Sequence, residues 1–353
     1  MKILRVLPSM DFAGIERGVY DFSLCADRMG HKVIIVSGFG RFIPLLKNKG
    51  IVWYDTSTEH KSIKTFITAA KKIEDIIEKE KPDVIHSESR FPCWIMSKVI
   101  RKFPEIPWVT SIHSFCPFRF YTKSLGFGRR VIVVSNAVKK YAIEYLKIPE
   151  EKLRLVYNGV SKDDFWEIKK EKNEIPVIGM VARFSSTKGH FYYLKAMEKL
   201  SKEGIKVRGM FIGSGSKRYR EKLKKHVYKK GMKDFVNVLS MDSKDGLKKI
   251  DILVVPSFEP EGFGRTVVEG QMAGVVVIGT NIGAIPELIE DKKTGFLVSP
   301  KNSFQIAEAI KYALSNPAEM TAITENAQKN ALEKFTVEKM TEETLKVYKE
   351  SML

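Results

Sequence analysis

Two glutamates flank a glycine-rich stretch in the segment EPEGFGRTVVEGQMAG, which follows the apolar run DILVVPS. Gly262 and Gly264 let the backbone come close to a ligand, and the amides at the start of the helix that follows can bind phosphate or sugar oxygens. The Glu261 carboxylate can accept hydrogen bonds from sugar hydroxyls, and Glu269, about two helical turns further on, can point along the same face. The alternative is a surface helix that carries two solvated acids.

Two cations stand in a similar position in the segment GMVARFSSTKGHFYYLKAMEKL. Arg183 comes just after an apolar run, and Lys188 stands at the entry to a predicted helix. Two cations at the mouth of a helix N-terminus can clamp a diphosphate, and fixed positive charge there would stabilise a leaving group that gains negative charge in the transition state. The alternative is a pair of ordinary surface cations in a Lys-rich chain.

Two weaker signals lie in the first half of the chain. The turn SMDFAGIERG is not the GxGxxG fingerprint, which argues against a dinucleotide-dependent dehydrogenase, but Gly14 still allows an amide to approach a phosphate. In SIHSF, His113 ends a predicted strand, where it could bond a sugar hydroxyl or assist proton movement. A purely structural role is the alternative for His113, and His86 in DVIHSES has a similar position and a weaker case.

These residues stand at the ends of short apolar runs that alternate with helical patterns. The runs predicted as strands are KILRVLP, KVIIVSG, PDVIHS, WVTSIHS, RVIVVSN and LRLVYNG in the first half, then PVIGMVARF, VRGMFIGSG, FVNVLS, DILVVPS, VVVIGT and GFLVSP. Continuously apolar strands separated by helices predict parallel sheets covered on both faces. We therefore expect an α/β protein with two doubly wound Rossmann-like domains that face each other across a cleft.

The polar segment SKDDFWEIKKEKNEIP interrupts this alternation and is interpreted as a linker. The expected division is an N-terminal domain over 1–162, a second domain over 163–336, and a C-terminal helix over 337–353 that packs back on the first domain. The length of 353 residues suits two domains, and no apolar run approaches the roughly 20 residues that span a bilayer. The apolar start is too interrupted for a signal peptide, so we expect a cytoplasmic protein.

The net charge is +18, from 60 Lys plus Arg against 42 Asp plus Glu. Such a charge attracts phosphates, nucleic acid or an acidic membrane face without choosing among them, and much of it can equally be solvated surface. The segment 115–130 mixes aromatic residues with cations, including Phe118 and Arg119. It suits either a peripheral contact with anionic headgroups at the inner face of the plasma membrane, or an ordinary loop whose aromatic side chains pack inward.

In combination, these motifs resemble the retaining glycosyltransferases of family four. The paired glutamates, the Arg183 and Lys188 pair, the Gly14 turn and His113 after a strand carry the resemblance, together with VSNAVKKY, VYNGV and TNIGAIPELIEDKKTGFLV. That family has the GT-B fold and uses nucleotide-diphosphate sugars. The stretches GIERGVYDFS, HSESRFPCW and EPEGFGRTVVEGQ look more closely like lipopolysaccharide-core glycosyltransferases, including mannosyltransferase-like members.

The resemblance implies roles for individual residues. The implied catalytic residues are Glu261, His113, Arg183 and Lys188. The implied donor-binding residues are Gly14, Arg183, Lys188, Phe263, Gly264, Arg265, Thr266 and Glu269, with Glu269 on the ribose hydroxyls. Relatives often carry two glycines in the first turn, where this chain has Ala13 and Gly14, which puts that contact in doubt.

The resemblance also implies a front-face, metal-independent transfer with retention, with no cofactor besides the donor. The expected partners are a UDP-, GDP- or ADP-linked sugar and a glycan or glycolipid acceptor, such as a lipopolysaccharide core or another cell-envelope glycan. Two alternatives remain: a phosphorylase- or epimerase-like enzyme of similar fold, and a basic nucleic-acid-binding protein. The chain lacks an RNP-type aromatic motif, zinc-finger spacing and a bZIP pattern, so no nucleic acid is expected.

Overall fold

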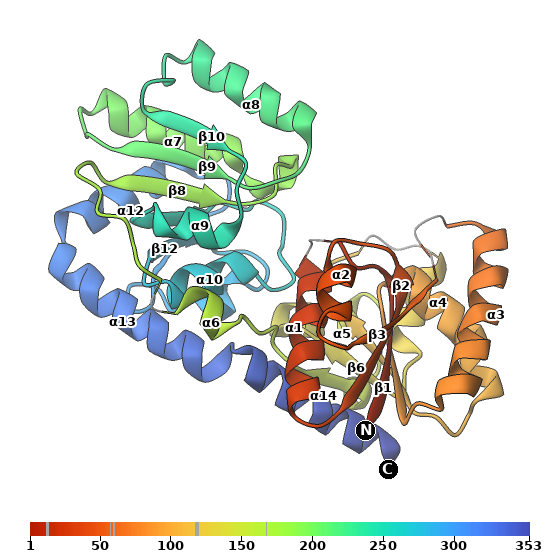
Figure 1. The fold of residues 1–353 in the computed structure, drawn as a ribbon. Helices are drawn as coiled ribbons and strands as arrows, with labels where there is room; N and C mark the ends of the chain where they lie inside the picture. The colour runs from red at the N-terminus through yellow and green to blue at the C-terminus, as the bar shows by residue number, and fades with distance from the viewer. Residues whose placement is uncertain (12–13, 57, 59–60, 117–119, 167) are drawn as a thin grey trace. The chain divides into compact units, whose positions relative to one another are not determined.

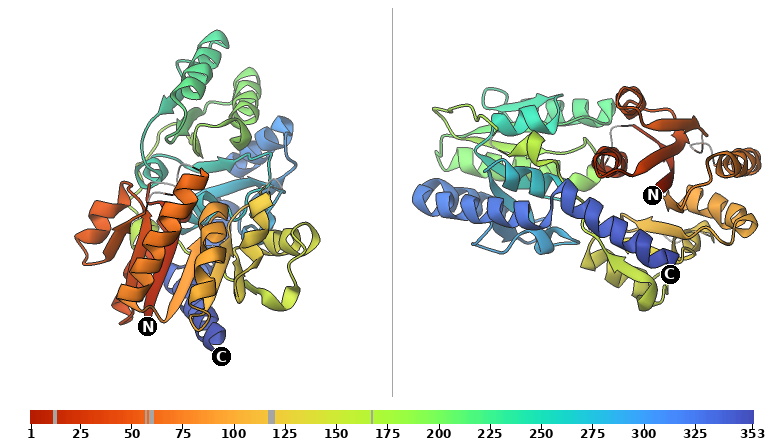
Figure 2. Two further views of the ribbon diagram at one scale, coloured as in Figure 1. Left: turned by 90° about the vertical axis from the view of Figure 1, so that its right-hand side faces the viewer. Right: turned by 60° about the horizontal axis from the view of Figure 1, so that its bottom comes forward.

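The structure, a computed structural model, describes residues 1–11, 14–56, 58, 61–116, 120–166 and 168–353 (Figure 1). These residues form two compact units. The first unit contains Met1–Val160 and Thr336–Leu353, so both ends of the chain belong to it (Figure 2). The second unit contains Ser161–Phe335. Each unit is built around one parallel sheet with helices on both faces.

The first unit holds a sheet of seven strands in the order β3-β2-β1-β4-β5-β6-β7. Its strands are β1 Lys2–Ser9, β2 Lys32–Gly38, β3 Val52–Asp55, β4 Val84–Glu88, β5 Trp108–Ile112, β6 Arg130–Val133 and β7 Leu153–Leu155. Its helices are α1 Gly14–Arg28, α2 Phe42–Lys47, α3 Ile63–Glu80, α4 Arg90–Val99, α5 Asn136–Glu144 and α14 Val337–Met352, with 3₁₀ turns at Ile100–Lys102, Phe120–Gly126 and Glu150–Lys152. The strand order reverses between β1 and β4, and such a reversal opens a crevice at the carboxyl ends of the strands.

The sequence patterns explain most of these elements. Strands β4 and β5 are buried along their whole length, which accounts for their continuous apolar and small-polar runs. Helix α3 begins after Ser62, whose side chain accepts a hydrogen bond from the Thr65 amide. It ends at Glu80, with Lys81 as its C-cap residue just before Pro82. Strand β3 was not predicted, because VWYD is short and half-exposed at the edge of the sheet and carries no long apolar run.

The second unit holds six parallel strands in the order β10-β9-β8-β11-β12-β13. They are β8 Val177–Val181, β9 Arg208–Ile212, β10 Val236–Leu239, β11 Ile252–Val255, β12 Val276–Thr280 and β13 Phe296–Val298, and all six were predicted. The helices are α6 Lys162–Phe165, α7 His190–Lys202, α8 Lys217–Lys229, α9 Ser243–Lys248, α10 Arg265–Met272, α11 Ile285–Leu288, α12 Ser303–Ser315 and α13 Pro317–Lys334, with a 3₁₀ turn at Ser186–Lys188. Here the order reverses between β8 and β11.

The segment that was interpreted as a linker folds onto the second unit. It contains the short helix α6, where Phe165 is buried. The Glu171 amide donates to the Lys248 carbonyl at 2.8 Å, and Asn173 Nδ2 donates to Asp251 Oδ2 at 3.0 Å. The polar composition of the segment therefore reflects surface packing with specific hydrogen bonds.

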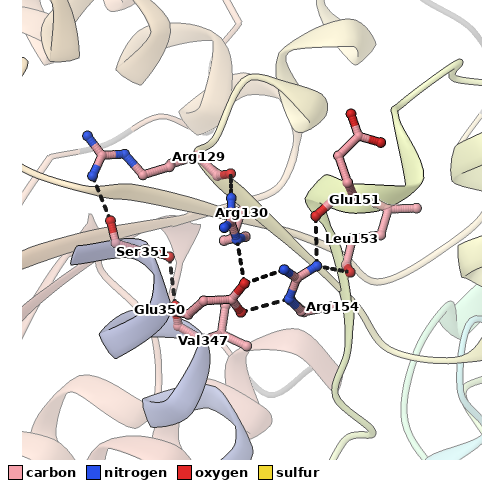
Figure 3. Close-up of polar contacts among 8 residues, drawn as sticks. All are labelled: Arg129, Arg130, Glu151, Leu153, Arg154, Val347, Glu350 and Ser351. Carbon is pink, nitrogen blue, oxygen red and sulfur yellow. Dashed lines mark hydrogen bonds and ion pairs between the residues drawn. The ribbon is translucent and has the colours of Figure 1, made fainter. Parts of the chain in front are cut away.

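Helix α14 returns to the first unit and is held there by charged groups at its end. Figure 3 shows Glu350 between two arginines of neighbouring strands: Arg130 Nε donates to it at 3.0 Å and Arg154 Nε at 2.7 Å. Arg129 Nη1 donates to the Ser351 carbonyl at 2.7 Å. Gly159 permits close packing at the other end, because a β-carbon there would lie 2.5 Å from the Thr336 carbonyl oxygen.

Candidate active site

The crevice of the second sheet contains an ion pair between Lys188 and Glu261. Lys188 follows β8 and Glu261 follows β11, the two strands between which the strand order reverses. The Lys188 Nζ atom lies 2.9 Å from Glu261 Oε2, and the two side chains are 26% and 18% exposed. The Ser257 hydroxyl donates to the other carboxylate oxygen of Glu261. A carboxylate and an ammonium group, both accessible, therefore meet where open α/β sheets bind ligands.

Two glycines bring the loops of this site together. Gly189 has φ +82, and a β-carbon there would lie 1.9 Å from the Pro256 carbonyl oxygen. Gly283 has φ +61, and a β-carbon there would lie 2.6 Å from the Glu261 backbone nitrogen. The Ala284 amide donates to the Glu261 carbonyl at 3.0 Å. Backbone thus packs directly on backbone at Pro256 and at Glu261, which only glycine allows at positions 189 and 283.

Two helices begin at the same site. Helix α7 begins after Gly189, and helix α10 begins after Gly264, whose φ is +102. Because glycine is the N-cap residue in both, no N-cap side chain lies over the first amides of either helix. Helix N-termini of this kind carry partial positive charge and bind the oxygens of phosphate groups.

Arg183 lies after β8 and its side chain is exposed. It makes no ion pair with any residue in the described ranges. The loop after β9 packs against Ala182 and the Arg183 side chain: a β-carbon on Gly213 would lie 2.1 Å from the Ala182 carbonyl oxygen, and one on Gly215 would lie 2.8 Å from Arg183 Cγ. Sequence analysis interpreted VRGMFIGSG only as a strand, although its last two glycines, Gly213 and Gly215, indicate such a close approach.

The remaining predicted donor-binding residues of this unit lie on or before α10. Arg265 Nε lies 3.1 Å from Glu269 Oε1, one helical turn away, and Glu269 is 7% exposed. Thr266, in the first turn, is half-buried. Phe263 points into the core, where its ring meets Phe335 edge-on with centroids 5.9 Å apart. A ligand contact from Phe263 would therefore come from its backbone.

In the first unit, His113 lies in front of a buried ion pair. It follows β5, and its Nε2 atom lies 3.0 Å from Oε2 of Glu88, the last residue of β4. Glu88 is 1% exposed and is ion-paired with Arg5 of β1. Burial, with the nearby Arg5 charge as a second cause, lowers the pKa of His113 to about 4. The imidazole is therefore neutral at pH 7.

His86, which had the weaker functional case in the sequence, makes structural contacts. Its Nδ1 atom lies 2.6 Å from the Tyr348 hydroxyl of α14, and its Nε2 atom lies 2.5 Å from the Ser111 hydroxyl. Burial lowers the pKa of His86 well below its ordinary value and raises that of Tyr348 to about 12, so both groups are neutral. The pair ties α14 to the centre of the first sheet.

Gly14 is the first residue of α1. A β-carbon there would have no atom within 4 Å in the described structure, so the local packing does not require glycine. Ala13, which departs from the resembled pattern, lies outside the described residues. His113 lines two pockets of this unit, one of about 320 Å³ and one of about 30 Å³.

Two aromatic side chains of the segment 115–130 pack against other rings, and a third is exposed. The Phe115 ring meets Tyr141 edge-on with centroids 5.5 Å apart, and Tyr121 stacks on Trp94 with centroids 5.8 Å apart. Phe127 is 55% exposed. Phe118 and Arg119 lie outside the described residues. Within the described ranges, no helix has both the length and the apolar composition needed to cross a membrane.

The structure thus places the predicted residues in two groups. Arg183, Lys188, Glu261, Phe263, Gly264, Arg265, Thr266 and Glu269 belong to the second unit, and Gly14 and His113 belong to the first. Sequence analysis missed Ser257, Glu88 and Arg5. Glu88 and Arg5 look like ordinary strand residues in the sequence, and only the order of the strands brings them to His113.

Comparisons with known proteins agree with this architecture. Residues 12–164 match the family model described as Glycosyltransferase Family 4, and residues 161–330 match the model described as Glycosyl transferases group 1. An uncharacterized glycosyltransferase of Methanocaldococcus jannaschii is 28% identical over 92% of this chain and 91% of its own. An O-antigen biosynthesis glycosyltransferase of Escherichia coli is 26% identical over 70% of this chain and 75% of its own.

Solved structures extend the likeness to the fold. A glycosyltransferase from Rickettsia africae matches with a TM-score of 0.90 and 28% identity, over 99% of this chain and 98% of that chain. An Anabaena protein solved in complex with UDP-glucose matches with a TM-score of 0.84 and 21% identity, over 98% and 99% of the two chains. The two units of this chain are therefore the two Rossmann-like domains of a GT-B glycosyltransferase.

Proposed function

We propose that the protein is a retaining, metal-independent glycosyltransferase that moves a sugar from a nucleotide diphosphate to a hydroxyl of a cell-envelope glycan. The observation that carries the proposal is the accessible Lys188–Glu261 pair at the crevice of the second sheet, between two helices with glycine N-caps. A sugar diphosphate requires both kinds of group: cations and amides for the phosphates, and a carboxylate for the sugar hydroxyls.

The site residues of the second unit each bind a different part of the donor. Lys188 and Arg183 bind the diphosphate, and the amides at the start of α10 bind the sugar and phosphate oxygens. Glu269 accepts hydrogen bonds from the ribose hydroxyls. In the structure, Glu261 is paired with Lys188. The diphosphate competes for Lys188, which leaves Glu261 to accept hydrogen bonds from the transferred sugar.

The reaction follows from this placement of charge. The bond between the anomeric carbon and the diphosphate oxygen breaks through an oxocarbenium-like state, and the acceptor oxygen bonds to the same face. Lys188 and Arg183 stabilise the negative charge that develops on the leaving diphosphate, and they supply this charge without a metal. The leaving phosphate oxygen takes the acceptor proton. Neutral His113 accepts a hydrogen bond from a sugar hydroxyl.

Two similar proteins narrow the substrates to be tried first. The Anabaena structure contains UDP-glucose, which supports a UDP-linked sugar as the donor. The similar Escherichia coli protein is named for O-antigen biosynthesis, which supports a cell-envelope glycan as the acceptor. The contact that Gly14 makes with the donor phosphate, through its amide at the start of α1, belongs to the same proposal.

A thermal-shift panel tests the donor site. The purified chain is heated with UDP-, GDP-, ADP- and CMP-sugars, beside the variants Glu269→Ala and Lys188→Ala and the exposed control Lys206→Ala. A ligand that binds only the folded state raises the melting temperature. One nucleotide class should stabilise the wild type and the control but neither site variant. If no nucleotide shifts the wild type at millimolar concentration, the proposed function is wrong.

A product analysis tests the stereochemistry. The anomeric configuration of the product, read from proton NMR coupling constants during a single transfer, should equal that of the donor sugar. EDTA should leave the rate unchanged. An inverted product, or activity that returns only with a divalent cation, would contradict the retaining, metal-independent mechanism.

A further inference from the structure

The first unit contains a pocket of about 320 Å³ whose charged groups all have the same sign. It lies at the carboxyl end of β5 and the start of α4, and its lining includes His113. Lys61 and Arg90 line it, and no described lining residue is acidic. Its volume is in the range of small-molecule pockets, which run from about 300 to 1,000 Å³. A cavity with cations and no acid favours an anionic ligand.

The guanidinium of Arg90 has a buried donor without a partner. It lies over the Tyr121 ring, with Cζ 5.8 Å from the centroid. Its Nη1 atom is buried and makes no hydrogen bond with any residue that the structure describes. The charge of Arg90 is likewise unpaired within the described ranges. A buried donor without a partner is unfavourable, and a ligand oxygen would satisfy it.

Thr58 supplies a second buried polar atom without a hydrogen-bond partner in the same pocket. Its side chain is 1% exposed, and its hydroxyl oxygen finds no hydrogen-bond partner among the described residues. Threonine is more often satisfied by a nearby backbone carbonyl, and the hydroxyl can rotate to donate to an oxygen ligand. Lys61 lies close in sequence, lines the same pocket and makes no ion pair in the described part of the chain.

The start of α4 forms another part of the wall. Ser89, Arg90, Phe91 and Pro92 all line the pocket, and α4 is ten residues long. Ser89, the N-cap residue, has φ +70 and ψ +154, a conformation that glycine normally occupies, and its side chain makes no capping hydrogen bond. Strained backbone of this kind persists where the surrounding structure holds it, commonly at ligand sites. The positive end of the helix dipole adds to the cationic field.

We propose that this pocket binds a phosphate group carried by the acceptor. The proposal rests on the proposed function, because it takes the bound molecule to be the acceptor of the transfer. A planar guanidinium, an ammonium, a hydroxyl and a helix N-terminus together suit the several oxygens of a phosphate better than they suit a neutral sugar. His113 lines the same pocket, so a single acceptor could present a hydroxyl to His113 and a phosphate to Arg90. The substrate class is a phosphorylated sugar or glycan.

Calorimetric titration of the full chain tests the pocket. The probes are glucose 6-phosphate, inorganic phosphate and the uncharged methyl glucoside. Arg90→Met keeps the length of the side chain and removes the charge, and Thr58→Val removes only the hydroxyl. Arg101→Met is the matched control, because Arg101 is exposed and lies in the same unit. Both phosphate probes should bind the wild type and Arg101→Met, and methyl glucoside should not bind.

The loss on substitution should be about tenfold or more for Arg90→Met, as expected for a hydrogen bond to a charged group, and smaller for Thr58→Val. Glucose 6-phosphate should still bind in the presence of saturating UDP. Three results would overturn the proposal. The first is no phosphate binding to the wild type at concentrations up to about 10 mM. The second is an affinity in Arg90→Met and Thr58→Val equal to that of the wild type. The third is full competition by UDP, which would place the phosphate in the donor site. Failure of UDP-sugars to bind, with phosphate binding intact, would contradict the proposed function alone.

Discussion

The Nε2 atom of His113 lies 3.0 Å from Oε2 of Glu88, whose carboxylate is ion-paired with Arg5 behind it. The two atoms approach closely but do not have hydrogen-bond geometry, so the contact does not select a tautomer of the imidazole. Both charged groups are almost completely buried. Removal of either Arg5 or Glu88 therefore leaves an uncompensated charge in the core.

Substitution of Glu88 by Leu alone should lower the free energy of unfolding by about 3–5 kcal/mol, because Arg5 is left buried without its partner. The double variant Arg5→Met with Glu88→Leu should recover much of this loss, since no charge then remains buried. Urea unfolding of the wild type, the two single variants and the double variant measures the coupling. Additive losses would mean that the two side chains do not stabilise each other.

Substitution of Lys188 by Met should lower kcat for sugar transfer by about 100-fold, because a fixed charge at the leaving group is lost. The free energy of unfolding should change by no more than about 1 kcal/mol, since the Lys188–Glu261 pair is partly exposed to solvent. Kinetics with saturating donor and urea unfolding of the same preparation separate the two effects. The exposed Lys206→Met should behave as the wild type in both.

The stability of the protein should fall as the pH drops from about 6.5 to 4. Burial lowers the pKa of both His113 and His190 to about 4, so between these values the unfolded chain binds protons that the folded chain does not. Each histidine contributes at most about 3 kcal/mol, fully present above pH 6.5 and lost as the pH falls to 4. Urea unfolding across this range measures the slope.

The charged groups that face His113 are Arg5, Glu88 and Glu16. His190 is instead packed among the rings of Phe184, Phe211 and Tyr219. In His190→Phe the slope of stability against pH should become shallower, since one of the depressed groups is gone. An unchanged slope in that variant would show that His190 does not contribute.

Glu350→Gln should loosen α14 from the first unit. Hydrogen bonds from Arg154, and then from Arg130, lower the pKa of Glu350 to about 2. Because its side chain is 36% exposed, solvent screening reduces the expected loss to about 1 kcal/mol. The contribution is present above pH 4.5 and is lost as the pH falls to 2. Hydrogen exchange of α14 should accelerate in this variant, whereas Glu342→Gln, on the same helix without an ion pair in the described structure, should leave it unchanged.

Gly283→Ala and Gly204→Ala form a matched pair, with φ of +61 and +74. At Gly204 no described atom lies within 4 Å of an added β-carbon, so the variant should cost only about 1–2 kcal/mol of left-handed backbone strain. At Gly283 the β-carbon meets the Glu261 backbone, so the loss should reach about 3 kcal/mol and donor binding should fall as Glu261 moves. Equal effects in unfolding and donor titration would mean that the contact with Glu261 does not matter.

Much of the fold and part of the candidate site can be predicted from the sequence, because the patterns that indicate them lie within short segments. The apolar runs of β8 and β11 and the glycines before α7 and α10 place Lys188 and Glu261 after strands and beside helix starts. Alternation of strands and helices alone predicts parallel sheets, since it depends only on neighbouring residues. The edge strand β3 cannot be predicted from this alternation, because it is short and half-exposed and has no apolar run.

Tertiary structure alone decided which of these residues meet. His113 is marked in the sequence by its place after an apolar strand, but nothing in the sequence near Arg5 or Glu88 distinguishes them from surface charges. Only the order of β1, β4 and β5 brings the three residues together. Likewise, only the structure shows that the Thr58 hydroxyl and the Arg90 donor are buried without partners among the described residues and that both residues line one pocket. The sequence by itself determined the secondary elements and the chemical groups at their ends. Strand order and packing determined the pairings, because burial and electrostatic partnership depend on contacts between residues far apart in the chain.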